Sequence, residues 1–132
     1  MKTATINRIR ENSCQGVDTI IGVYSYRLAY DHNRECWDIF RAKTEDVARE
    51  WINSDGQIVS AWQPMGLSGM VEAQTIAWKL REEGEWNGEW NPDLCERLAA
   101  LAGMADEYRE ADGETFEAVL FKAAEVLGVE II

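Results

Sequence analysis

Apolar residues recur with two different spacings, and the change between them divides the chain near residue 67. Before it, apolar positions recur every second residue, which is the spacing of a strand with one buried face. After it, they recur every third or fourth residue, which is typical of an amphipathic helix. The pattern predicts an α+β fold, in which an antiparallel sheet in residues 1–67 packs against a mainly helical half in residues 68–132.

The predicted sheet is built around an N-terminal hairpin. Residues 18–30 are rich in β-branched and aromatic side chains and alternate as one long strand. A polar turn over 31–34 leads into residues 35–42, which alternate again, so we expect the two strands to pair antiparallel. A third strand is expected over 57–62, and a further one over 3–9.

One helix is expected inside the strand-rich half. Thr44 is a good N-cap residue, and Glu45 and Asp46 suit the positive end of a helix dipole. Apolar residues then follow at helical spacing as far as Ile52. The polar residues 53–56 should end this helix.

Start and stop signals organise the helical half. The apolar positions between residues 73 and 80 have helical spacing, and Gly84 predicts the end of that helix. Asn91 followed by Pro92 indicates the start of another, because asparagine caps a helix and proline fits its first turn. We therefore expect a loop between the two helices.

Two features of this half stay open. The apolar stripe that starts at Leu94 continues across Gly103 to Tyr108, which fits one long helix or two helices with a break at the glycine. A last helix should open at Asp112 and end at Gly128. The final four residues form either a short strand or a buried tail.

Length and composition favour one folded domain over residues 1–132. A chain of 132 residues with 46% hydrophobic content can bury enough surface for a core without disulfides or metals. No apolar run approaches the roughly 20 residues of a spanning helix, and residues 1–9 lack the apolar region of a signal peptide. We expect a cytoplasmic protein.

The net charge of −11 is concentrated in the helical half. Residues 1–67 carry nine acidic and eight basic residues, whereas residues 68–132 carry 15 acidic and five basic ones. The resulting field opposes contact with phosphates, so we expect no direct binding to nucleic acid or to a membrane. The expected partner is a basic protein or nucleoprotein complex.

Residues 82–91 combine this charge with two tryptophans in the sequence EEGEWNGEWN. We expect a surface loop, where a tryptophan ringed by polar residues is a common interface anchor. Trp86 and Trp90 either contact a partner or fold back to cap the helical core, as tryptophan is highly buried on average. The sequence leaves both arrangements open.

Few residues are available for catalysis or for metal binding. His32 is the sole histidine, which excludes sites with two histidines. A Cys-His-Asp set with Cys36 and Asp31 is disfavoured, because a turn separates the groups and nothing supplies an oxyanion hole. Glycine-rich phosphate-binding motifs are missing, and pairs of carboxylates arise by chance among 24 acids. We expect no catalytic residue, no metal ion, no cofactor and no enzymatic activity.

The three cysteines lie far apart and form no C-x-x-C motif. This spacing argues against a disulfide framework and against a zinc site. Because free cysteine is among the most buried residue types, we expect Cys14, Cys36 and Cys95 to be buried thiols.

These features favour a protein-binding inhibitor that occupies the basic nucleic-acid-binding surface of a DNA- or RNA-handling complex. Small acidic anti-CRISPR and anti-restriction proteins of phages and plasmids act in this way. The expected partner-binding residues are Glu82, Glu83, Glu85, Trp86, Glu89, Trp90, Asp106, Glu107, Glu110, Asp112, Glu114 and Glu117. The alternative is an adaptor or assembly subunit that docks through Trp86 and Trp90 or through a sheet edge. Because such an edge could pair with a second copy, we expect a monomer or a homodimer.

Overall fold

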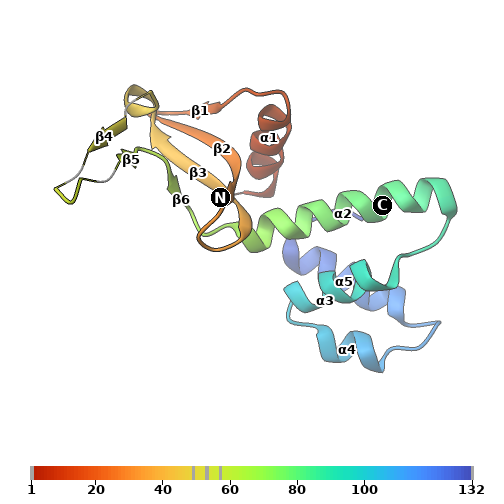
Figure 1. The fold of residues 1–132 in the computed structure, drawn as a ribbon. Helices are drawn as coiled ribbons and strands as arrows, with labels where there is room; N and C mark the ends of the chain where they lie inside the picture. Colours follow the sequence, from red (N-terminus) through yellow and green to blue (C-terminus); the bar gives the residue numbers. More distant parts are fainter. Residues whose placement is uncertain (1, 49, 53, 57, 132) are drawn as a thin grey trace. The chain divides into compact units, whose positions relative to one another are not determined.

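The chain forms two compact units, residues 1–71 and residues 72–132, each with its own cluster of buried apolar side chains. The computed structural model describes residues 2–48, 50–52, 54–56 and 58–131, of which residues 50–52, 58–59 and 85–87 are described by their backbone alone. The predicted α+β class is confirmed: strands lie in the first unit, and helices dominate the second (Figure 1). A single domain over the whole chain stays a prediction.

The first unit opens with a helix, α1 (Thr3–Cys14), so the strand expected over residues 3–9 is wrong. Ile6 and Ile9 are fully buried and lie three residues apart, a spacing that places both on one face of a helix. They pack with Tyr26 and Ile39 of the sheet. Contact with the sheet therefore decides the structure of a segment whose own sequence is ambiguous.

A four-stranded antiparallel sheet in the order β1-β2-β3-β6 forms the centre of this unit. Its strands are β1 (Thr19–Ile21), β2 (Tyr24–Asp31), β3 (Cys36–Lys43) and β6 (Gln63–Pro64). The predicted hairpin is confirmed as β2 and β3, with Leu28 opposite Ile39. The long strand expected over 18–30 is in fact two strands, because the chain turns at Gly22, where φ is +61°.

The helix expected after Thr44 is wrong. Residues Thr44–Asp46 form a short 3-10 turn, and the strand β4 (Glu50–Ile52) follows. Thr44 lies inside this turn and does not cap a helix, and its hydroxyl is 2.9 Å from that of Ser25 in β2. Asn53, where that helix was expected to stop, lies outside the described residues.

The third predicted strand is confirmed as β5 (Ile58–Ser60), although it does not join the main sheet. It pairs antiparallel with β4 in a separate two-stranded sheet, with Glu50 opposite Ser60. Gln57, the first residue of the expected strand, lies outside the described residues.

The second unit is built mainly from four helices. They are α2 (Ser68–Asn87), which begins in the first unit, α3 (Pro92–Leu101), α4 (Ala105–Glu110) and α5 (Phe116–Leu127). The predicted stop at Gly84 is wrong, since α2 continues to Asn87 and the next residue, Gly88, adopts a φ of +65°. The expected loop over 82–91 is therefore helical as far as residue 87, and residues 88–91 alone connect the helices.

The other helix boundaries follow the local signals. The side chain of Asn91 accepts hydrogen bonds from the backbone N–H groups of Asp93 and Leu94, which confirms the predicted cap. Gly103, with a φ of +73°, separates α3 from α4, so the apolar stripe belongs to two helices. Gly128 has a φ of +70° and ends α5 as predicted.

Asp112 lies just before α5, as expected, but its side chain caps the turn that precedes the helix and not the helix itself. Its carboxylate accepts hydrogen bonds from the backbone N–H groups of Glu114 and Thr115. After α5, residues 129–131 form no strand, and Ile131 is 4% exposed. Of the two arrangements expected for the last residues, the described part is the buried tail.

One face from each of α2, α3 and α5 meets in the core of the second unit. The cluster consists of Ala73, Ile76, Ala77, Leu80, Cys95, Leu98, Leu120, Ala124 and Ile131. None of the helices in the described part of the chain combines the length and the apolar composition needed to cross a membrane.

Candidate functional site

The largest group of acids along the sequence lies where α4 connects to α5. Residues 106–117 contain six carboxylates and one cation, Arg109. We call this stretch the acidic segment, and its acids are Asp106, Glu107, Glu110, Asp112, Glu114 and Glu117, all of which are exposed. Three lie on α4, two in the connection and one in the first turn of α5 (Figure 1). Consecutive elements thus present the predicted acids to solvent.

Little positive charge neutralises the acidic segment. Arg109 lies 3.5 Å from Asp106 and 3.6 Å from Glu96, in pairs that are exposed on both sides. Within the described residues, no cation lies within ion-pair distance of Glu107 or Glu110. The same holds for Glu114 and Glu117, so the segment is strongly negative at neutral pH.

Asp112 has a structural role within the acidic segment. Hydrogen bonds from the backbone N–H group of Glu114 and from Thr115 lower the pKa of its carboxyl group. These bonds favour the ionised form and hold the turn before α5. The negative charge of Asp112 is therefore part of the folded connection.

The predicted residues of the region 82–91 are divided between α2 and the connection that follows. Glu82 is exposed on α2, and Glu89 is exposed in the connection. Glu83 is half-buried. Burial of the Cys95 thiol is the main cause that raises its pKa to about 11, and the negative charge of Glu83 is the second cause. Glu85 and Trp86 lie in α2, but their side chains are outside the described residues.

Trp90 packs against the core of the helical unit. It is half-buried, and its ring meets that of Phe121 edge-on, with the ring centroids 6.3 Å apart. Of the two arrangements that the sequence left open, the structure shows the packed one for this residue.

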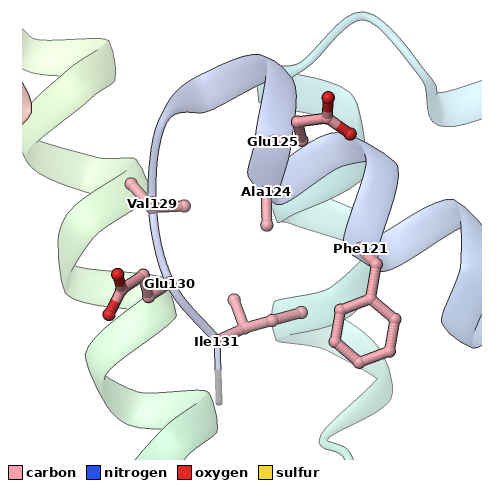
Figure 2. Close-up of a pocket in the computed structure, with 6 residues that line it drawn as sticks. All are labelled: Phe121, Ala124, Glu125, Val129, Glu130 and Ile131. Carbon is pink, nitrogen blue, oxygen red and sulfur yellow. The ribbon is translucent and has the colours of Figure 1, made fainter.

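A shallow hollow of about 310 Å³ lies between α5 and the C-terminal tail. Its lining residues are Phe121, Ala124, Glu125, Val129, Glu130 and Ile131. Figure 2 shows Ala124 and Ile131 facing this space, with the ring of Phe121 beside it. Sequence reasoning missed the hollow, because the pattern did not show where the tail lies. The available signal was the placement of Phe121 and Glu125 one turn apart on one face of α5.

The disfavoured Cys-His-Asp set is not assembled in the hairpin. The carboxylate of Asp31 accepts a 2.7 Å hydrogen bond from Nε of Arg34, the first cause of its lowered pKa. The His32 ring instead meets the ring of Tyr30 edge-on, with the centroids 5.1 Å apart. Cys36 is half-buried in β3. Asp31 therefore stabilises the turn with Arg34.

The cysteines differ in exposure from the prediction. All three are free, but Cys95 alone is buried, while Cys36 is half-buried and Cys14 is exposed at the end of α1. Ile6 and Ile9 face the core of the first unit from α1, whereas Cys14 does not. Among the described residues, no group of three or more histidine, cysteine or acidic side chains is placed to hold a metal ion.

Comparison of the chain with protein-family models, with curated proteins and with solved structures gave no match. The function is therefore inferred from the chemistry of the chain itself. The features available for that inference are the acidic segment and the adjoining hollow of the helical unit.

Proposed function

We propose that this protein is an inhibitor that binds a basic protein surface and excludes nucleic acid from it. The helical unit carries the binding face, and the acidic segment supplies most of the contacts. The target is a DNA- or RNA-handling protein or complex in the same compartment, which we take to be the cytoplasm. Anti-CRISPR and anti-restriction proteins are the functional class to which this activity corresponds.

The observation that supports this proposal is the separation of charge between the units. Residues 72–132 carry 15 acidic and five basic residues, whereas residues 1–71 are close to neutral, with nine and eight. A net charge that served only solubility would not need to be concentrated on one of the two units. A field concentrated on one unit steers that unit towards positive surfaces and disfavours acidic ones.

Carboxylates can substitute for phosphates because both accept hydrogen bonds from arginine and lysine in similar geometry. A groove built to bind nucleic acid presents several such cations in a row. Glu107, Glu110, Glu114 and Glu117 offer exposed carboxylates along α4, the connection that follows it and the first turn of α5. Binding through them needs no catalytic group, and it weakens as salt screens the charges.

The proposal is tested by affinity capture on the immobilised protein from a nuclease-treated lysate, washed in parallel at low and high salt. We expect a basic nucleic-acid-binding protein that is retained at low salt and lost at high salt. The test variant is Glu107→Gln, Glu110→Gln and Glu114→Gln combined, and it should capture much less of the same protein. The control is Glu11→Gln, Glu35→Gln and Glu45→Gln, which removes the same charge from exposed positions of the first unit.

Equal loss in both triple variants would mean that net charge alone drives capture, and this would contradict a binding face on the helical unit. A partner that resists salt and handles no nucleic acid would also contradict the inhibitor proposal.

One observation favours the adaptor as a second candidate function. β1 is an edge strand, and four exposed aliphatic side chains lie in or beside it: Val17, Ile20, Ile21 and Val23. An uncharged edge of this kind can accept a further strand from a partner. The same capture distinguishes the two functions, because Ile20→Lys should abolish salt-resistant binding to a strand partner and leave salt-sensitive binding to a basic one unchanged.

A further inference from the structure

The hollow between α5 and the C-terminal tail combines an apolar floor with acidic sides. Ala124 and Ile131 are buried, and Val129 is half-buried, so the floor is aliphatic. Glu125 lies on α5 and Glu130 on the tail, and both side chains are exposed. Figure 2 shows the two glutamates on opposite sides of the space that Ala124 and Ile131 face, with both carboxylate groups directed away from that space.

An aromatic ring lies beside the aliphatic floor. Phe121 is 40% exposed even though its ring meets that of Trp90 in a T-shaped arrangement. The face of such a ring attracts a cation electrostatically, and a guanidinium group also stacks on it. The hollow thus offers an aliphatic surface and an aromatic surface to one bound group, and two carboxylates lie on its outer rim.

The carboxylates are weakly neutralised. Nζ of Lys122 lies 3.9 Å from Glu125, in a pair whose two side chains are well exposed, and such pairs contribute little binding energy. No cation within the described part of the chain lies within ion-pair distance of Glu130. An incoming positive charge therefore meets a negative rim within a unit whose overall charge is −10.

We propose that this hollow receives one arginine side chain from the basic partner. The aliphatic stem of the arginine lies on Ala124, Val129 and Ile131, and its guanidinium group stacks on the ring of Phe121, where the negative charge of the rim favours it. Arginine fits better than lysine, because its planar head can stack on a ring while it donates several hydrogen bonds. The volume of about 310 Å³ is at the lower limit for small-molecule sites, which suits a single side chain. This inference rests on the proposed function and names the partner group that anchors the complex.

The test uses the peptide acetyl-Ala-Gly-Arg-Gly-Ala-amide and methyl NMR spectra of the intact protein. We expect saturable shifts at Ala124, Val129 and Ile131. The citrulline peptide keeps the shape of arginine without its charge, and the norleucine peptide keeps the stem alone. Both should bind more weakly than the arginine peptide. A fourth peptide carries lysine in place of arginine. Equal binding of the first three peptides, or tighter binding of the lysine peptide than of the arginine peptide, would overturn the assignment to arginine.

Glu130→Gln should weaken binding of the arginine peptide by about fivefold, the upper limit for one exposed ion pair. Glu11→Gln, which removes an equal charge from the first unit, should leave the affinity unchanged. Shifts confined to the acidic segment, with none at the hollow, would overturn the inference and leave the proposed function standing. Specific arginine binding here, in a protein that captures no basic partner, would support the site and contradict the proposed function.

Discussion

At the scale of single residues, the buried carboxylate of Asp38 organises the end of the first unit. Its oxygens accept hydrogen bonds from the backbone N–H groups of Gly66 and Leu67, at 3.0 and 2.7 Å. The guanidinium group of Arg34 donates a further bond to it. An aspartate at an alternating strand position normally indicates a solvent-facing side chain, so the sequence could not reveal this role. Asp38 instead fixes the segment that leads into α2.

Replacing Asp38 by asparagine should lower the free energy of unfolding by about 2 kcal/mol, the usual scale for hydrogen bonds to a buried charged group. The loss arises because the amide N–H groups of asparagine can face the backbone N–H groups of Gly66 and Leu67, which need an acceptor. Urea unfolding measures the change, with the exposed Glu11→Gln as the control. A loss below about 0.5 kcal/mol, which is typical of surface changes, would contradict this role.

The cysteines provide a second prediction at this scale. Burial and the nearby charge of Glu83 raise the pKa of the Cys95 thiol from its ordinary 9.0 to about 11. Ellman's reagent should therefore modify the exposed Cys14 in the native protein and reach Cys95 only on unfolding. Rapid labelling of Cys95 in a Cys14→Ser variant under native conditions would contradict the described packing.

The same pKa shift predicts a stability change at alkaline pH. Between pH 9 and 11 the unfolded chain releases the Cys95 proton while the native protein keeps it. Stability gained from this thiol is therefore present below pH 9 and is lost as the pH rises through 11. The fall should be smaller in Cys95→Ala, measured by urea unfolding at pH 8 and pH 10.

At the scale of elements, the boundaries that depend on neighbouring residues could be predicted from the sequence. The cap at Asn91 and the stop at Gly128 follow from backbone preferences of one or two residues, whereas the sequence left the break at Gly103 open. The hairpin of β2 and β3 was also predictable, because two strand-like runs flank the polar turn over residues 31–34.

Elements fixed by distant contacts could not be predicted in this way. α1 forms where Ile6 and Ile9 meet the sheet, and Thr44 contacts Ser25, which lies 19 residues away. The same limit applied to the candidate site. The acids of 106–117 were recognisable from composition, but the packing of Trp90 and the hollow depend on where α5 and the tail lie.

Two glycines test the helix boundaries of the second unit. Gly84 lies inside α2 with open space around it, so Gly84→Ala should raise the free energy of unfolding by about 0.5–1 kcal/mol. Gly103 also has open space, but its φ is +73°, so Gly103→Ala should lower stability by about 1 kcal/mol. Thermal unfolding measures both variants. A stabilising Gly103→Ala would contradict the break between α3 and α4.

At the scale of the whole molecule, charge is the property that distinguishes the two units. The first unit pairs several of its charges, as in the contact of 2.9 Å between Arg27 and Asp18. The second unit leaves the outer faces of α4 and α5 negative. We infer from this division that the helical unit meets the partner and that long-range attraction brings the two together. Two further proposals stay separate from this one: that β1 accepts a strand from a partner, and that the hollow binds an arginine side chain of the partner.

The most direct measurement is a competition assay with the captured partner and its labelled nucleic acid. We predict that the wild-type protein displaces the nucleic acid completely, less so as salt rises. The variant that combines Glu107→Gln, Glu110→Gln and Glu114→Gln should displace the nucleic acid only at a concentration at least about tenfold higher, because each lost contact weakens binding. A ternary complex in which the partner holds the protein and the nucleic acid together would contradict the account.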